Sequence, residues 1–243
     1  NAFTLLSRLY GQTYAPASYY TFDGVNPLSD SMNVASLNPY YYSSYYTIGT
    51  NASAQGVGKY MSLYSNSAII KGADFIPDTA MTVEFLLKPG LNFDTQILLW
   101  AQNGCFQIKM GYSFIDFLTT SYTAANAVYD HTFRVDLINV GRKSYGYYID
   151  GNWHHMVFKY NPKTGVKQIW VDGQNPAGFQ VTVPTINCHF NPGTYNALYI
   201  NTNSTTYNYR GDIDELAIYK YDLHQNMIYK HYQNFLANNH YSF

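Results

Sequence analysis

Charged side chains are scarce in this chain of 243 residues. Only 12% of the residues are charged, and the acidic set contains just two glutamates, Glu84 and Glu215. The 14 basic and 15 acidic residues leave a net charge of -1. So weak a field does not draw a protein to phosphate backbones or anionic lipids, so nucleic acid is not an expected partner. The few Glu and Lys residues also argue against long exposed helices.

Cysteines and long apolar runs are rare as well. No run of about 18 apolar residues is present, so membrane insertion is not expected. The two cysteines, Cys105 and Cys188, have no C-x-x-C spacing, which argues against a zinc site. They either form one disulfide, as in an oxidising compartment, or remain two buried thiols.

Two features favour a secreted or surface-exposed location, either extracellular or on a particle. The chain starts at Asn1 without an initiator Met, as a processed or trimmed end would. Glycosylation sequons occur at Asn51-Ala52-Ser53 and Asn203-Ser204-Thr205. Both features agree with secretion, and neither identifies a function.

Aromatic residues are abundant by contrast. The chain has 27 Tyr, 14 Phe and 3 Trp. Tyrosine suits half-buried strands because of its β-propensity, and it suits wet contact surfaces because it combines an apolar face with a hydroxyl. The composition leaves both interpretations open. Residues 38–49 form a Tyr-rich segment of their own.

From Lys59 onward, short β-type runs alternate with turn residues, which predicts a sandwich of antiparallel strands. Asn103-Gly104, Asp150-Gly151 and Asp172-Gly173 are two-residue hairpin sequences, and residues 161–165 form a longer turn. The predicted strands cover residues 19–22, 60–64, 81–88, 96–101, 105–110, 114–118, 133–140, 153–160, 168–171, 197–200 and 212–219.

The pattern changes to a helical period after Tyr221. Leu223, Met227, Ile228, Tyr232 and Phe235 would share one face of a short C-terminal helix. Two histidines, at positions 224 and 231, are seven residues apart and would also share a face. Solvated helix histidines are a simpler interpretation of that pair than a ligand pair.

Five stretches along the chain carry a family pattern. They are residues 20–24 (YTFDG), 81–89 (MTVEFLLKP), 150–155 (DGNWHH), 169–173 (IWVDG) and 211–219 (GDIDELAIY). In this order and at these spacings, they resemble the laminin-G-like branch of the concanavalin-A-like lectin/glucanase superfamily. The resemblance runs from about residue 19 to residue 236.

The resemblance implies an all-β fold, a jelly-roll sandwich of two antiparallel sheets, to which the helical pattern adds a short C-terminal helix. Many members are secreted and act in carbohydrate binding or adhesion, and the family packs an aromatic residue between the sheets at the position of Trp153. We therefore expect an N-terminal arm or extension over residues 1–18 and a laminin-G-like β-sandwich domain over residues 19–243. The first 18 residues and the Tyr-rich segment depart from the family pattern.

Enzymatic activity is not expected. Glycosidases of this superfamily place acidic residues at alternate positions of one strand, where they share a face. The nearest strand here has Asp212, Asp214 and then Leu216, so the third carboxylate is missing. On a regular strand, Asp214 and Glu215 would point to opposite faces. Adjacent His154 and His155 would likewise point apart, with one of them in the core. Glycoside hydrolysis remains the lowest-ranked alternative.

A structural calcium ion is a plausible inorganic feature. Asp23 and Asp30 lie in an early loop, and Asp212 and Asp214 open the late strand. In many relatives these regions meet around an ion, and hard oxygen ligands suit Ca²⁺. The alternative is that these carboxylates bond backbone amides at turns.

Glycan or glycoprotein is the expected partner of a non-catalytic carbohydrate-binding or adhesion module. Sugar sites combine aromatic faces with amides and carboxylates, and three segments near predicted turns have this mixture. The candidate carbohydrate-binding residues are Tyr145, Tyr147, Tyr148, Tyr207, Asn208, Tyr209, Gln102 and Asn103.

A structural subunit of a virion, sheath or extracellular filament is the main alternative. Low charge and the Tyr-rich segment would suit large interfaces with copies of itself or with other structural subunits. Residues 2–6 would then form an arm that adds a strand to a neighbour's sheet. A disordered terminus would have the same sequence.

Overall fold

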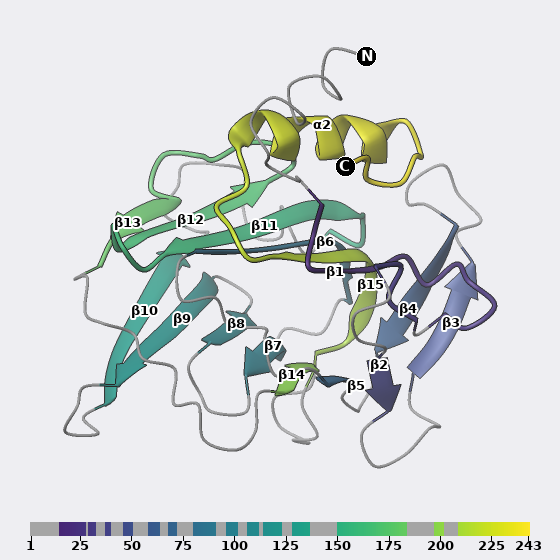
Figure 1. Cartoon of the computed structure of the whole chain (residues 1–243), viewed down its shortest axis with the longest axis horizontal. Helices are drawn as coiled ribbons and strands as arrows, with labels where there is room; N and C mark the ends of the chain where they lie inside the picture. The colour runs from purple at the N-terminus through teal and green to yellow at the C-terminus, as the bar shows by residue number, and fades with distance from the viewer. Residues whose placement is uncertain are drawn as a thin grey trace.

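The computed structural model of the protein describes residues 15–27, 29–32, 37–39, 46–50, 58–63, 68–71, 80–90, 96–101, 106–111, 114–122, 128–136, 150–183, 197–201 and 209–243. These residues form strands β1 to β15 and the helix α2 (Figure 1). The elements are β1 Ser18–Tyr20, β2 Leu37–Pro39, β3 Tyr46–Thr50, β4 Lys59–Leu63, β5 Ala68–Lys71, β6 Met81–Pro89, β7 Gln96–Ala101, β8 Phe106–Met110, β9 Phe114–Tyr122, β10 Val128–Asp136, β11 His154–Asn161, β12 Val166–Val171, β13 Gln180–Thr182, β14 Ala197–Ile200, β15 Gly211–Tyr219 and α2 Gln225–Leu236.

The strands form two antiparallel sheets. One sheet has eight strands in the order β13-β12-β11-β6-β15-β4-β3, with β1 also paired to β15. The other has seven strands in the order β10-β9-β8-β7-β14-β5-β2. The predicted all-β sandwich is confirmed, and Figure 1 shows α2 on the side of the eight-stranded sheet that faces away from β7 to β10.

The accuracy of the strand prediction varied along the chain. The observed bounds of β7 and β14 match the predicted runs, whereas β10 starts at Val128, earlier than predicted. Four short strands, β2, β3, β5 and β13, were not predicted. β2 and β3 lie in or beside the Tyr-rich segment, so part of that segment belongs to the sandwich.

The turn predictions gave mixed results. Residues 161–165 join the antiparallel pair β11 and β12 as predicted. Asp172-Gly173 forms a tight turn with both residues at positive φ, closed by a bridge between Val171 and Gln174. Asn103-Gly104 lies outside the described residues, but β7 and β8 on either side of it pair. The hairpin predicted at Asp150-Gly151 is wrong, because β10 and β11 belong to different sheets.

The main core fills the space between the two sheets. Alternate residues of each strand face inward, as the two-residue period of a strand requires. On β6, for example, Val83, Phe85 and Leu87 belong to the core, whereas Glu84 and Leu86 face the opposite way. At about 25 cal/mol per Å² of buried apolar surface, this core is the chief stabilising term of the fold.

Helix α2 covers part of the outer face of the eight-stranded sheet. Its buried residues, Met227, Ile228, His231 and Phe235, follow a helical period, and the side chain of His224 accepts a hydrogen bond from the helix's first turn. The predicted C-terminal helix is thus confirmed. Within the described ranges, no helix has the length and apolarity needed to cross a membrane.

Trp153 occupies a different layer from the one expected. It is buried, with 6% of its surface exposed, but it clusters with Leu86 and Phe235. Tyr60 meets it edge-on at 5.6 Å between ring centroids. The prediction of a buried indole is confirmed, whereas its expected position between the sheets is wrong, because this residue precedes β11 and packs under α2.

Two glycines offer a direct test of the contact between α2 and the Asp172-Gly173 turn that follows β12. Both Gly151 and Gly173 have left-handed φ, at +79° and +71°. A Cβ at Gly173 would come within 2.7 Å of the Tyr232 ring, whereas a Cβ at Gly151 would meet nothing within 4 Å. We expect Gly151→Ala to cost about 1 to 2 kcal/mol, the usual left-handed penalty.

Gly173→Ala should cost more, because it also displaces Tyr232 from its place on α2. Urea unfolding of the two variants measures the difference in the free energy of unfolding. Equal losses would show that the turn does not support the helix.

Candidate functional site

The outer face of the seven-stranded sheet presents a continuous row of side chains across five strands. The antiparallel register places Tyr199, Trp100, Gln107, Leu118 and Thr132 side by side on β14, β7, β8, β9 and β10. Four interstrand spacings make this row about 19 Å long. In the described part of the chain, the only helix lies on the other sheet.

An aromatic pair forms one end of this row. The rings of Trp100 and Tyr199 stack with centroids 4.3 Å apart and planes 14° apart. The indole nitrogen of Trp100 donates a hydrogen bond of 3.0 Å to the carbonyl of Asn201, which fixes the ring's orientation. Trp100 is half-buried, whereas Tyr199 is buried. The partly exposed indole can therefore act as a rigid apolar platform.

A β-bulge gives Trp100 this orientation. The pairing of β7 with β8 shifts register between Ile97 and Leu99. Consecutive residues Leu98 and Leu99 both enter the core, and the next residue then faces outward. On a regular strand, Leu98 and Trp100 would share a face, so the bulge allows both core leucines and an outward indole.

A second row next to the first supplies charged groups. Lys109, Asp116 and Arg134 are cross-strand neighbours on β8, β9 and β10. Arg134 binds the Asp116 carboxylate through two hydrogen bonds of 2.6 Å, and its guanidinium lies 4.1 Å from the centroid of the Phe114 ring. These contacts hold the guanidinium in place on the sheet surface.

Together the two rows combine an indole face, an amide and an ion pair on one rigid surface, which we call the Trp100 face. The apolar carbons of a pyranose ring pack on an indole, and its hydroxyls need both donors and acceptors. Sequence reasoning did not single out these residues. Alternation along the predicted strands could have indicated Gln107 and Arg134 but not Trp100, because the bulge breaks the alternation before it. Gln102 and Asn103, which were predicted, directly follow β7 in the sequence.

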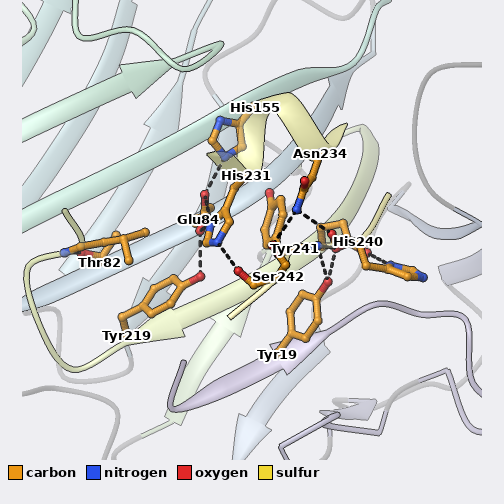
Figure 2. A network of polar contacts seen from close by, with 12 residues as sticks. Tyr19, Thr82, Glu84, His155, Tyr219, His231, Asn234, His240, Tyr241 and Ser242 are labelled. Carbon is orange, nitrogen blue, oxygen red and sulfur yellow. Dashed lines mark hydrogen bonds and ion pairs between the residues drawn. The ribbon is translucent and has the colours of Figure 1, made fainter. Parts of the chain in front are cut away.

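A fully buried polar cluster lies elsewhere, between the eight-stranded sheet and α2 (Figure 2). The Glu84 carboxylate accepts hydrogen bonds from His155 Nε2 at 2.6 Å, His231 Nδ1 at 2.9 Å and the Tyr219 hydroxyl at 2.9 Å. All four residues are fully buried. This cluster has no surface open to a ligand, and it joins α2 to β6, β11 and β15.

The electrostatics of this cluster favour a charged Glu84. Burial by itself would raise the pKa of Glu84, but the positive charge of His231 and the hydrogen bonds from both imidazoles outweigh it. The net effect lowers the pKa of Glu84 from 4.5 to about 2. The predicted solvated role of His231 is wrong, because its helix face packs on the sheet. His224 is exposed at the helix N-terminus, as that interpretation expected.

Glu215, the other glutamate of the chain, is also fully buried and bound by a histidine. Its carboxylate contacts His240 Nδ1 at 2.6 Å and accepts hydrogen bonds from the Tyr19 hydroxyl and the Tyr241 backbone amide. His240 Nε2 also lies 3.2 Å from Asp23. The hydrogen bond to Glu215 outweighs partial burial and raises the pKa of His240. The tail that follows α2 is thus fastened to β15 and to the loop after β1.

The prediction that Asp214 and Glu215 point to opposite faces of the sheet is wrong, because β15 is irregular at these residues. The pairing of β15 with β6 shifts register between Asp214 and Ala217, and Glu215 has φ of +51°. Asp214 pairs with Leu86 on the outer face, and the Glu215 carboxylate meets His240 and the Tyr19 hydroxyl on that same face. A β-bulge therefore puts the two acidic groups on the same side of the sheet. Both are fully buried.

The predicted calcium ligands do not gather. Asp30 accepts hydrogen bonds from the Tyr19 and Met32 amides, Asp212 from the Ser62 hydroxyl, and Asp214 from the Glu215 amide. Asp23 does meet the late-strand region, as expected, but the group between it and Glu215 is the imidazole of His240. No cluster of three or more metal-ligating side chains occurs among the described residues. Backbone amides and one hydroxyl donate to Asp30, Asp212 and Asp214 here, and calcium binding itself stays a prediction.

One predicted sugar-binding residue lies inside the protein. Tyr209 is 1% exposed, belongs to the core between the sheets and donates from its hydroxyl to the Lys88 carbonyl at 3.3 Å. Its phenol is therefore enclosed rather than presented to a ligand. The predicted residues outside the described part of the chain are Tyr145, Tyr147, Tyr148, Tyr207, Asn208, Gln102 and Asn103, together with Cys105, Cys188 and the arm before residue 15.

The adjacent histidines of β11 separate as predicted. His155 belongs to the buried Glu84 cluster. The two ring nitrogens of His154 contact Asp172 at 2.9 Å and Asp150 at 3.1 Å. Burial lowers the pKa of His154, but the hydrogen bonds to these two carboxylates outweigh it and raise the pKa overall. The histidine ties together the two turns that flank β11 and β12.

Comparison with known proteins supports the fold. The model of the concanavalin A-like lectin/glucanases superfamily matches residues 58–229, and no curated protein sequence matches the chain. The binding domain of botulinum neurotoxin DC in complex with SialylT is similar in structure, with a TM-score of 0.63 and 14% identity over 90% of this chain and 50% of that one.

Two related structures give similar values. The receptor-binding domain of botulinum neurotoxin C/D mosaic serotype has a TM-score of 0.64 and a sequence identity of 11%. The ligand-binding domain of botulinum neurotoxin serotype D in complex with N-acetylneuraminic acid has a TM-score of 0.65 and a sequence identity of 9%. Each match covers 90% of this chain and 51% of the other. The chain thus spans about half the length of these structures, and at such low identity the likeness concerns the fold alone.

Replacing the buried carboxylate tests its role in holding α2. Glu84→Gln keeps the side-chain shape but leaves His155 and His231 without an anion, so we expect a loss of about 3 kcal/mol of stability near neutral pH. Because its folded pKa is lowered, Glu84 stabilises the fold fully above pH 4.5, and this contribution is lost as the pH falls toward about 2.

The free energy of unfolding in urea, measured for wild type and variant from about pH 6 to pH 3, should therefore show a difference that narrows on acidification. As a control, Asp222→Asn removes a half-exposed carboxylate from an ion pair with Lys159 and should cost less than about 1 kcal/mol. A difference that is constant with pH would contradict a charged Glu84.

Proposed function

Because the chain belongs to the concanavalin A-like lectin/glucanase superfamily, we propose that it is a non-catalytic carbohydrate-binding and adhesion module. We place its sugar site on the Trp100 face. The observation that carries this proposal is the stacked, half-buried indole in register with Gln107, with the Asp116–Arg134 pair two and three strands further along the same face. An oriented aromatic platform beside an amide, with an ion pair further along the face, suits a glycan of several sugars, which can stack one ring on the indole and reach the ion pair with another.

Several observations support binding without catalysis. The acidic pair Asp214 and Glu215 is fully buried and bonded within the protein, so no substrate reaches it. On the Trp100 face, both oxygens of the Asp116 carboxylate accept hydrogen bonds from Arg134, which does not favour a role as a catalytic acid or base. Two structurally similar neurotoxin domains were solved with N-acetylneuraminic acid and with SialylT, which agrees with a sugar as the partner.

The proposal includes a secreted or surface-exposed location, in agreement with the two glycosylation sequons. A glycan is reached from outside the cell, and a low net charge leaves recognition to stacking and hydrogen bonding rather than to long-range attraction. The partner is then a glycan or a glycoprotein.

A glycan array probed with the labelled protein tests the proposal. We expect Trp100→Ala to weaken binding to the recognised glycan at least tenfold, a loss of about 1.4 kcal/mol, because the stacking platform is gone. Arg134→Ala should weaken it as well, through loss of oriented donors.

The matched control is Thr182→Ala, an exposed position on the edge strand of the other sheet, which should bind like wild type. No glycan bound by the wild-type protein, or unchanged affinity of Trp100→Ala, would refute the proposed site. Ordered multimers in size-exclusion chromatography with light scattering, combined with no glycan binding, would favour a structural subunit.

A further inference from the structure

A second indole is presented on the opposite outer face of the sandwich. Trp170 lies on β12 of the eight-stranded sheet and is half-buried. Its inner side packs against the cluster that contains Val157, its cross-strand partner on β11. The indole nitrogen lies 3.4 Å from the side-chain oxygen of Gln168, which helps to orient the ring. Trp170 is thus anchored on one side and accessible on the other.

A polar row runs beside this ring. The register places Lys159, Gln168 and Gln180 next to one another on β11, β12 and β13. The Gln168 amide donates to the Gln180 oxygen at 2.5 Å, so each amide fixes the other. Lys159 lies 5.9 Å from the centre of the Trp170 ring and is paired with Asp222 at 2.5 Å.

This surface, which we call the Trp170 face, contains the same groups as the Trp100 face. Each has a half-buried indole, a glutamine from the same or a neighbouring strand, and an ion pair between a basic residue and an aspartate. The two faces belong to different sheets, and the main core lies between those sheets. They point away from each other, so one sugar cannot contact both.

We infer that the Trp170 face is a second carbohydrate site, specific for uncharged pyranose sugars, and that it makes the domain bivalent. This inference rests on the proposed function of the Trp100 face, since both use the same chemistry. The nearest cation to the ring, Lys159, is mostly buried and neutralised by Asp222, so no net positive charge attracts an acidic sugar. The paired amides instead offer a donor and an acceptor to neutral hydroxyls.

Bivalency has a physical consequence for adhesion. Two sites on opposite faces cannot be filled by adjacent sugars of one short chain, so each domain would bridge two glycan chains. Because the two faces point in opposite directions, their contacts would join two glycan-bearing surfaces and would not add avidity on a single one. A bridging module of this kind needs no oligomerisation to cross-link its targets.

Isothermal titration calorimetry with neutral hexasaccharides of glucose, mannose, galactose and N-acetylglucosamine tests the inference. We expect two sites per wild-type chain, one site in Trp170→Ala, one in Trp100→Ala and none in the double variant. Thr182→Ala, which lies near the Trp170 face without belonging to its polar row, should keep two sites.

A variant that leaves the packing intact separates binding from folding. Gln180 is exposed on the edge strand, so Gln180→Ala should preserve the melting temperature and weaken the second site at least threefold. Beads coated with the bound sugar should be aggregated by the wild type and not by Trp170→Ala.

The outcomes distinguish the two proposals. One site per wild-type chain, lost in Trp100→Ala and kept in Trp170→Ala, would overturn the second site and leave the proposed function standing. Binding to acidic glycans alone on the array would also overturn it. No binding of any glycan by the wild type would overturn both.

Discussion

Phe85 and Phe158 stack on neighbouring strands of the eight-stranded sheet with ring centroids 5.7 Å apart. Phe117 from the opposite sheet meets Phe158 edge-on at 5.6 Å. These rings form the centre of the core that fixes which side of every strand faces inward. Because side chains alternate, the same packing decides which residues face out, and so it places both the polar cluster under α2 and the Trp100 and Trp170 faces.

The outer faces of the two sheets differ in how their charged groups are accommodated. The outer face of the eight-stranded sheet buries the carboxylates of Glu84, Asp214 and Glu215, and a buried charge is costly unless it is paired and hydrogen-bonded. Histidines from α2 and from the tail supply these partners at Glu84 and Glu215, so the C-terminal segment is held by charge as well as by apolar contact (Figure 2). The face of the seven-stranded sheet has no such helix in the described part of the chain, and its ion pair lies on the same face as a half-buried indole.

Local irregularities matter more to function than the regular strands do. The bulge in β7 lets Leu98 and Leu99 enter the core while Trp100 faces outward. The bulge in β15 turns Glu215 to the side of Asp214, against simple alternation. A sequence pattern with strict period two describes neither position, because an inserted residue changes the face of everything that follows it.

The sequence by itself determined the all-β class, most strands from β6 to β15, the C-terminal helix and the superfamily, since these follow from local periodicity, turn residues and short motifs. Only the tertiary structure decided that Tyr209 is enclosed, that Trp153 packs under α2, that His231 meets Glu84 across 147 positions of sequence, and that Trp100 aligns with Gln107. The physical reason is that periodicity is a property of neighbouring residues, whereas these contacts depend on which strands pair and in which register. That pairing is set by the packing of the whole core.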